Sequence, residues 1–171
     1  MTAIGAHPND GNGNASGHVR IYSWNGTAWT QLGADIDGEA ASDLSGNSVA
    51  MSSDGTRVAI GAKTNDGGGG ASGHVRIYDS PADPMSWTFV DAVESGHIYQ
   101  SVDYGGHVFI AISSNAEPKV IRSADGGQTW TGISSAEDTA WMEVAYGDGV
   151  WVAVAAHGTN RVMRSTDAGL R

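Results

Sequence analysis

The chain has 171 residues, a formal net charge of −10 and no cysteine. This length suits one domain, or two very small ones, with a real buried core. The acidic balance argues against nucleic-acid binding, which needs a basic surface, and against docking on anionic lipid. Without cysteine the chain has neither a disulfide nor a thiolate metal site. No charged and apolar leader pattern opens the sequence, and no stretch approaches the ~20 apolar residues of a membrane span, so no membrane partner is expected.

Internal repeats organise the chain. Residues 3–22 return at residues 59–78, an offset of 56, with only four differences, and the eight letters ASGHVRIY occur in both copies. A second repeat has an offset of 42: VIRSADGG at residues 120–127 matches VMRSTDAG at residues 162–169. The sequence therefore predicts two pairs of units, residues 1–90 and residues 91–171, which together form one domain.

Each unit consists of short runs rich in valine, isoleucine, tyrosine and tryptophan. Glycine, asparagine, aspartate or proline bounds each run, which is typical of strands joined by tight turns. No window combines a helical period with good caps, and residues 35–43 are interpreted as a loop. In chain order the expected strands of the two complete units are SVAMSSDG, RVAIGAK, GHVRIYDS and SWTFV, then IYQSVDYG, HVFIAISS, KVIRSADG and TWTGIS.

Four strands per unit, repeated, predict an all-β propeller of about four blades. A single blade cannot bury both of its faces, so neighbouring blades must cover them. Aligned on the repeats, the chain begins at a second strand and stops before a fourth, giving three, four, four and three strands. Incomplete terminal blades expose unpaired strand edges, so we expect self-association, with a homodimer favoured.

A Trp-Thr pair marks the expected start of three fourth strands. The tryptophans are Trp29, Trp87 and Trp130. A large indole at this point is expected to wedge between adjacent blades, which is a structural role and not a ligand-binding one.

The first half resembles the FG-GAP repeats of integrin-like propellers. The resemblance covers residues 1–90 and rests on VAIGA at residues 58–62, GHVRIY at residues 73–78 and Trp87-Thr88, with their partners at residues 3–6, 17–22 and 29–30. It implies a propeller. Some blades of that family bind calcium through loops rich in aspartate.

The second half, residues 95–171, resembles Asp-box (BNR) repeats, whose pattern is Ser-x-Asp-x-Gly-x-Thr-Trp. The resemblance implies a structural turn that lies away from any active site. Two unlike kinds of repeat in one short chain also suggest a fragment or an engineered or recombined chain; both families are often extracellular, and the compartment stays unknown. The matching residues are Ser123, Asp125, Gly127, Thr129 and Trp130 in the first copy, and Ser165, Asp167 and Gly169 in the second.

Metal binding is weighed and set aside. The loops at residues 9–14 and 65–70 correspond to calcium loops, but each carries a single carboxylate, and calcium needs six to eight oxygen ligands. Residues 35–39 hold three carboxylates without calcium spacing and are interpreted as a solvated loop. The histidines lack zinc-ligand spacing, and His18 and His74 share one repeat position, which favours a structural role. We therefore expect no metal and no cofactor, with calcium as an outside possibility.

Catalysis is also not expected from the sequence. A sialidase would need a converging arginine cluster, whereas the arginines Arg20, Arg76, Arg122 and Arg164 repeat in register and look like blade-surface residues. The sequence therefore predicts no catalytic residues and a non-enzymatic propeller that acts as a scaffold or interaction module, with a protein or glycan ligand. The alternatives are a carbohydrate-binding propeller and, third, a sialidase-like glycosidase relative.

Overall fold

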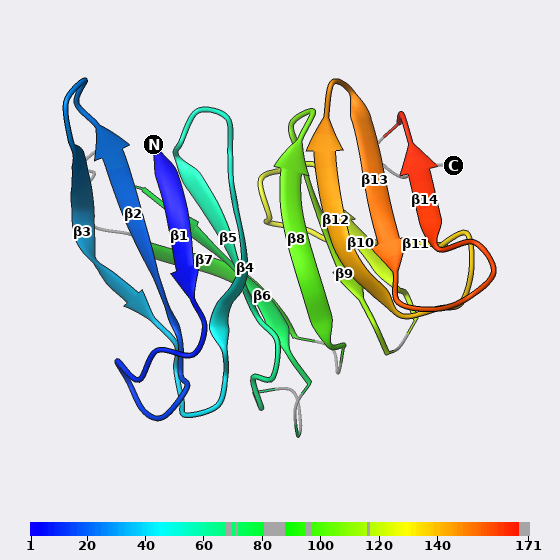
Figure 1. Ribbon diagram of the computed structural model, residues 1–171, viewed down its shortest axis with the longest axis horizontal. Helices are drawn as coiled ribbons and strands as arrows, with labels where there is room; N and C mark the ends of the chain where they lie inside the picture. Colours follow the sequence, from blue (N-terminus) through cyan, green and yellow to red (C-terminus); the bar gives the residue numbers. More distant parts are fainter. Residues whose placement is uncertain (68–69, 71, 81–87, 95–96, 116, 168–171) are drawn as a thin grey trace.

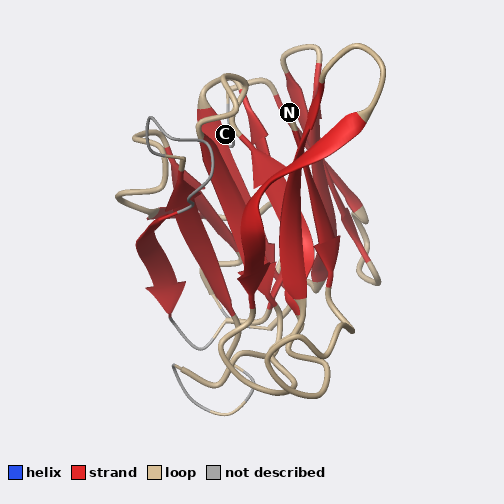
Figure 2. Ribbon diagram, turned by 90° about the vertical axis from the view of Figure 1, so that its left-hand side faces the viewer, coloured by secondary structure: helices blue, strands red, loops and turns tan. Residues whose placement is uncertain are grey.

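A computed structural model describes residues 1–67, 70, 72–80, 88–94, 97–115 and 117–167. Within these residues the chain forms strands, turns and loops and no helix (Figure 2). It follows that no described segment is an apolar helix of membrane-spanning length.

The strands form four antiparallel sheets, called blades 1 to 4 below. In every sheet, strands that follow one another in the chain also lie next to one another. The predicted all-β, propeller-like architecture of four small sheets, with three strands in each terminal one, is confirmed. Blade 1 consists of β1 (Thr2–Ala6), β2 (His18–Trp24) and β3 (Trp29–Asp37); blade 2 of β4 (Ser45–Met51), β5 (Arg57–Ala62), β6 (His74–Asp79) and β7 (Thr88–Glu94); blade 3 of β8 (Tyr99–Gly105), β9 (Val108–Ser113), β10 (Val120–Ser123) and β11 (Thr131–Ile133); blade 4 of β12 (Trp141–Gly147), β13 (Val150–Ala155) and β14 (Val162–Ser165).

The blades stand in a row in chain order, with blade 1 and blade 4 at opposite ends (Figure 1). The first strands β1, β4, β8 and β12 pack against one another from blade to blade. Polar contacts join these strands as well: Ser101 Oγ donates to Glu143 Oε1 at 3.0 Å, and the Tyr146 N–H donates to Asp103 Oδ2 at 2.7 Å. The first strands therefore form the common inner edge of the row.

The hydrophobic core is divided into three parts, one in each seam between neighbouring blades. Each part takes side chains from both of the blades that it joins, so it is the stacking of blades that removes their apolar faces from water. The buried residues are Val19, Ile21, Ile36, Val58 and Ile60 between blades 1 and 2; Ala50, Ala59, Val75, Ile77, Tyr99, Val102, Phe109, Ala111 and Ile121 between blades 2 and 3; and Val108, Ile110, Ile112, Val120, Trp141, Val144, Trp151 and Ala153 between blades 3 and 4.

Close packing of β1 on β4 depends on a glycine. A Cβ atom at Gly5 would collide with the backbone carbonyl of Gly46 in the neighbouring blade. A side chain at this position would therefore have to push blades 1 and 2 apart.

We predict that Gly5→Ala lowers the free energy of unfolding by about 1–3 kcal/mol, since overpacked sites have costs of that order. Gly147→Ala is the matched control, because a Cβ atom at this strand glycine meets nothing within 4 Å. Urea unfolding monitored by circular dichroism measures both. Equal stability of the two variants would contradict the close approach.

Candidate functional site

A polar cluster at one end of blade 1 brings together His18, Arg20, Asp35 and Asp37. His18 opens β2 and Asp37 closes β3, and the two residues are cross-strand partners. Ligating atoms of His18, Asp35 and Asp37 all lie within 4.8 Å of one another. His18 is buried and Asp37 is exposed, so one side of the cluster is open to solvent.

Arg20 and Asp35 form the charged centre of this cluster. Arg20 donates from Nε to Asp35 Oδ1 at 2.8 Å and from a terminal nitrogen to Oδ2 at 2.7 Å, a two-pronged geometry that fixes both groups. Gln31 donates a further hydrogen bond to Oδ1 at 2.8 Å, and His18 Nδ1 lies 3.8 Å from Oδ2. The hydrogen bonds from Arg20 are the main reason that the pKa of Asp35 falls to about 2, and the same contact raises the pKa of Arg20.

The cluster has the chemical groups of a hydrolytic site. An exposed carboxylate can accept a proton from water, and a guanidinium can stabilise negative charge that develops on a carbonyl oxygen. A divalent cation could be held by His18, Asp35 and Asp37, but it would compete with Arg20 for both oxygens of Asp35. The bonds present therefore favour the ion pair over a metal.

Sequence reasoning placed these residues differently. Residues 35–39 were expected in a solvated loop, but residues 35–37 belong to β3. The signal that could have revealed the cluster is the hairpin register. With a turn between Trp24 and Trp29 and one bulge, β2 and β3 place His18 opposite Asp37.

A cavity of about 450 Å³ lies between blades 3 and 4. Its volume would suit a small ligand, but among the described residues that line it there is no carboxylate and no imidazole, and Arg164 is the only charged one. In the preceding seam, Trp130 packs against a buried core cluster of blades 2 and 3. The blade 3 residues of that cluster have counterparts in the lining of the cavity at the 42-residue offset: Val102 matches Val144, Phe109 matches Trp151, Ala111 matches Ala153 and Ile121 matches Met163. The cavity therefore occupies the place that the Trp130 side chain fills in the preceding seam, and its described lining supplies no general acid or base.

The described residues of the two loops that were weighed as calcium sites, at residues 9–14 and 65–70, use their polar groups for turns. Asp10 Oδ1 accepts the Ala15 N–H at 2.7 Å, and Asn9 Oδ1 accepts the Gly11 N–H at 2.8 Å. In the second loop, Asn65 Oδ1 accepts the Gly67 N–H at 2.8 Å. These bonds stabilise the turns themselves.

A second polar cluster is closed off between blades 1 and 2. Asn65 donates to Asp43 at 2.9 Å, and Arg76 forms an ion pair with Glu39. His74 is 3% exposed, and its Nδ1 has no hydrogen-bond partner in the described part of the chain. Burial, followed by the charge of Arg76, lowers the pKa of His74 to about 4, so the ring is neutral at pH 7. Glu39 is exposed, whereas His74, Asp43 and Asn65 are buried, so the interior of this cluster offers little room for a substrate.

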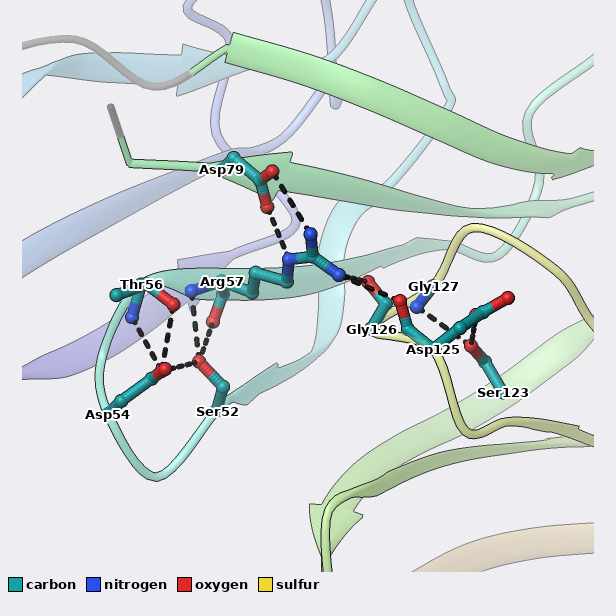
Figure 3. Close-up of polar contacts among 9 residues, drawn as sticks. All are labelled: Ser52, Asp54, Thr56, Arg57, Asp79, Ser123, Asp125, Gly126 and Gly127. Atoms are coloured by element: carbon teal, nitrogen blue, oxygen red, sulfur yellow. Dashed lines mark hydrogen bonds and ion pairs between the residues drawn. The ribbon is translucent and has the colours of Figure 1, made fainter. Parts of the chain in front are cut away.

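The Asp-box residues of blade 3 form a hydrogen-bonded turn (Figure 3). Asp125 Oδ1 accepts hydrogen bonds from Ser123 Oγ at 2.7 Å and from the Thr129 N–H at 3.0 Å, and Ser123 Oγ accepts the Gly127 N–H at 2.7 Å. Trp130 donates from its indole nitrogen to the Gly127 carbonyl at 3.1 Å. In blade 4, Ser165 Oγ donates to Asp167 Oδ1 at 2.7 Å, while Gly169 lies outside the described residues.

Arg57 links this turn to blade 2 (Figure 3). One terminal nitrogen donates to the carbonyls of Asp125 and Gly126 at 3.0 and 2.8 Å, and Nε lies 2.7 Å from an oxygen of Asp79. One side chain therefore connects two strands of its own blade to a loop of the next blade.

The three Trp-Thr tryptophans have different surroundings. Trp130 is partly buried against the core between blades 2 and 3. Trp29 is 56% exposed and contacts Trp24, so among the described residues the expected wedge does not form there. Trp87 lies outside the described residues.

Comparisons with known proteins give the fold and no family. Neither a family model nor a curated protein matches the sequence. Among solved structures, a protein described as a 6-phosphogluconolactonase from Bacteroides uniformis aligns with a TM-score of 0.53 and 11% identity over 98% of this chain and 53% of its own. The periplasmic gluconolactonase of Pseudomonas aeruginosa aligns with a TM-score of 0.55 and 13% identity over 95% of this chain and 48% of its own. The chain spans about half the length of these structures, and at such identities the likeness concerns the fold alone.

These findings correct two expectations from the sequence. The resemblance to FG-GAP and Asp-box repeats is wrong as a family assignment, since no family model matches and the structural neighbours bear lactonase names. The prediction of a non-enzymatic scaffold, with its lectin and sialidase-like alternatives, is corrected as well, because both neighbours are named as enzymes.

We predict that Arg57→Ala lowers the free energy of unfolding by about 2 kcal/mol, because hydrogen bonds to charged groups contribute about 1.5–3 kcal/mol. Arg57→Lys should recover part of this loss, since it keeps the charge without the fork. Arg161→Ala, at an exposed arginine with a single 3.3 Å bond to the Gly158 carbonyl, is the control. If urea unfolding shows the same loss of unfolding free energy for Arg57→Ala as for Arg161→Ala, Arg57 does not link the two blades.

We predict that the fold loses up to about 3 kcal/mol of stability between pH 7.5 and pH 4. The unfolded chain protonates His74 near pH 6.5, whereas the folded chain resists until about pH 4, so stability is full above 6.5 and falls through this window. His74→Gln should make the free energy of unfolding depend less on pH in this window. His7→Gln, at an exposed position, is the control, and thermal melts at half-unit pH steps that change equally for both variants would rule out His74 as the cause.

Proposed function

We propose that this chain hydrolyses the ester bond of a sugar lactone at the blade 1 cluster. The observation that carries the proposal is the Arg20–Asp35 pair with the exposed carboxylate of Asp37 beside it. The likeness in fold to two proteins named as lactonases supports the choice of a cyclic ester as substrate.

The proposed chemistry is the addition of water to the lactone carbonyl. Asp37 accepts a proton from the attacking water, and Arg20 stabilises the negative charge on the carbonyl oxygen. Collapse of the intermediate breaks the ring C–O bond, and the ring oxygen takes up the proton held by Asp37. The carboxylic acid formed releases its own proton to solvent, so the products are a carboxylate and a hydroxyl on one open chain, with one proton released. Asp35, ionised because of its low pKa, holds Arg20 in place.

An uncharged lactone is the favoured substrate. The chain carries a net charge of −10, which repels a phosphorylated sugar over the whole surface.

The test is titration of the acid released from glucono-δ-lactone at constant pH, with spontaneous hydrolysis subtracted. We expect a rate proportional to protein concentration, at least tenfold lower kcat/KM in Asp37→Asn and in Arg20→Gln, and no loss in the presence of EDTA. Asp148→Asn, at an exposed turn carboxylate of blade 4, is the matched control. A rate equal to the buffer blank, or Asp37→Asn matching Asp148→Asn, would refute the proposal.

A further inference from the structure

The exposed large apolar side chains of the described residues lie only on the two end blades. Strands β4 to β6 and β8 to β11, whose side-chain burial the structure describes, hold none of them, although these strands also supply apolar core residues. Large apolar side chains that gather on one exposed face mark a surface that another surface covers. They are Met1, Ile4, Trp24 and Trp29 on blade 1, and Met142, Val152, Val154 and Val162 on blade 4.

The exposed face of blade 4 repeats a face that blade 3 buries. At the 42-residue offset Val162 corresponds to Val120 and Val154 to Ile112. Val120 is 3% exposed under blade 4, whereas Val162 is 62% exposed. In both blades these two residues are cross-strand partners, and cross-strand partners share one face of a sheet. The outer face of blade 4 therefore has the form of a face that takes a further blade.

The exposed face of blade 1 repeats a face that blade 2 buries. Ile4 corresponds to Ile60 at the 56-residue offset, and the two are 53% and 2% exposed. Trp24 and Trp29 are cross-strand partners whose ring centroids lie 5.4 Å apart, and they add a large aromatic surface. Blade 1 thus presents the face that receives a preceding blade, and blade 4 presents the face that receives a following one.

We infer that a second copy of this chain covers both faces, with blade 4 of each copy stacked on blade 1 of the other. A two-fold axis then makes two identical seams and leaves neither face exposed. The assembly has eight blades, within the known range for propellers. Two copies also match the length of the structural neighbours, of which one copy spans 53% and 48%.

A second copy fits better than an unrelated partner because each chain carries both halves of the missing seam. In each of the three seams inside the chain, the face of one blade that points toward the next blade packs on the face of that next blade that points back. Stacking blade 4 of one copy on blade 1 of the other repeats this arrangement. The lactone site borders this seam, because Arg20 is the cross-strand partner of Ile4 and shares its face. The test of the inference reads mass and cross-linking alone, so its failure is distinguishable from a failure of the proposed hydrolysis.

The first test is the mass in solution by light scattering across a concentration series. We expect twice the chain mass of 17.6 kDa for the wild type, and one chain mass for Val154→Glu and for Ile4→Glu, each of which places a charge in the seam. Gln128→Glu, which adds the same charge to an exposed loop of blade 3, should remain dimeric. Circular dichroism melts verify that all variants are folded.

The second test uses the absence of cysteine to map the contact. Single-cysteine variants Val154→Cys and Ile4→Cys are treated with a short bifunctional maleimide, separately and mixed. A seam between unlike faces gives a cross-linked dimer in the mixture and not in either variant alone.

Three results would overturn the inference. A wild-type chain that stays monomeric at 100 μM shows that the faces do not meet. Cross-linking of Val154→Cys with itself shows a contact between like faces, and masses that grow beyond two chains show a contact that does not close. The inference is supported if Val154→Glu and Ile4→Glu both abolish the dimer, and if Val154→Cys and Ile4→Cys cross-link only when they are mixed.

Discussion

Apolar side chains cover both faces of the blades in this chain, and every other feature of the fold follows from the need to cover them. All six residues of β9 are buried, although successive side chains of a strand point to opposite faces. No blade can satisfy this pattern by itself, because each ~100 Å² of apolar surface left in water costs about 2.5 kcal/mol. Stacking is the solution that the chain adopts, and the cores between blades are its direct result.

The same constraint explains where the candidate site lies. Arg20 and Arg76 occupy one repeat position, yet they have different partners. Arg76 reaches Glu39, which follows the last strand of the preceding blade, whereas Arg20 pairs with Asp35 of its own sheet. The site at the end of blade 1 therefore repeats a surface of blade 2, but no other described blade of the same chain covers it, and its arginine is held by a carboxylate of its own sheet. His74 is enclosed in a seam and His18 borders an open face for the same reason.

Sequence repeats carried most of the information about the fold. The offsets of 56 and 42 residues, with short runs ended by turn residues, were sufficient to predict four sheets and their strand numbers. The family names failed because a turn pattern reports local chemistry and not descent. Asp54 shows this: it accepts hydrogen bonds from Ser52 Oγ at 2.6 Å and from the Thr56 N–H at 3.0 Å, much as Asp125 does, in a unit assigned to the other family. The site cluster was missed because it depends on the register of a bulged hairpin, which composition and spacing leave open.

One comparison tests the central claim, that coverage by a neighbouring blade decides what each face contributes. Val120 and Val162 are the same residue type at the same repeat position, one covered and one open. The account predicts that Val120→Ala lowers the free energy of unfolding by about 2 kcal/mol. Val162→Ala should lower it by less than about 0.5 kcal/mol in urea titrations at a dilution where the chain is monomeric. Equal losses from the two substitutions would contradict the account.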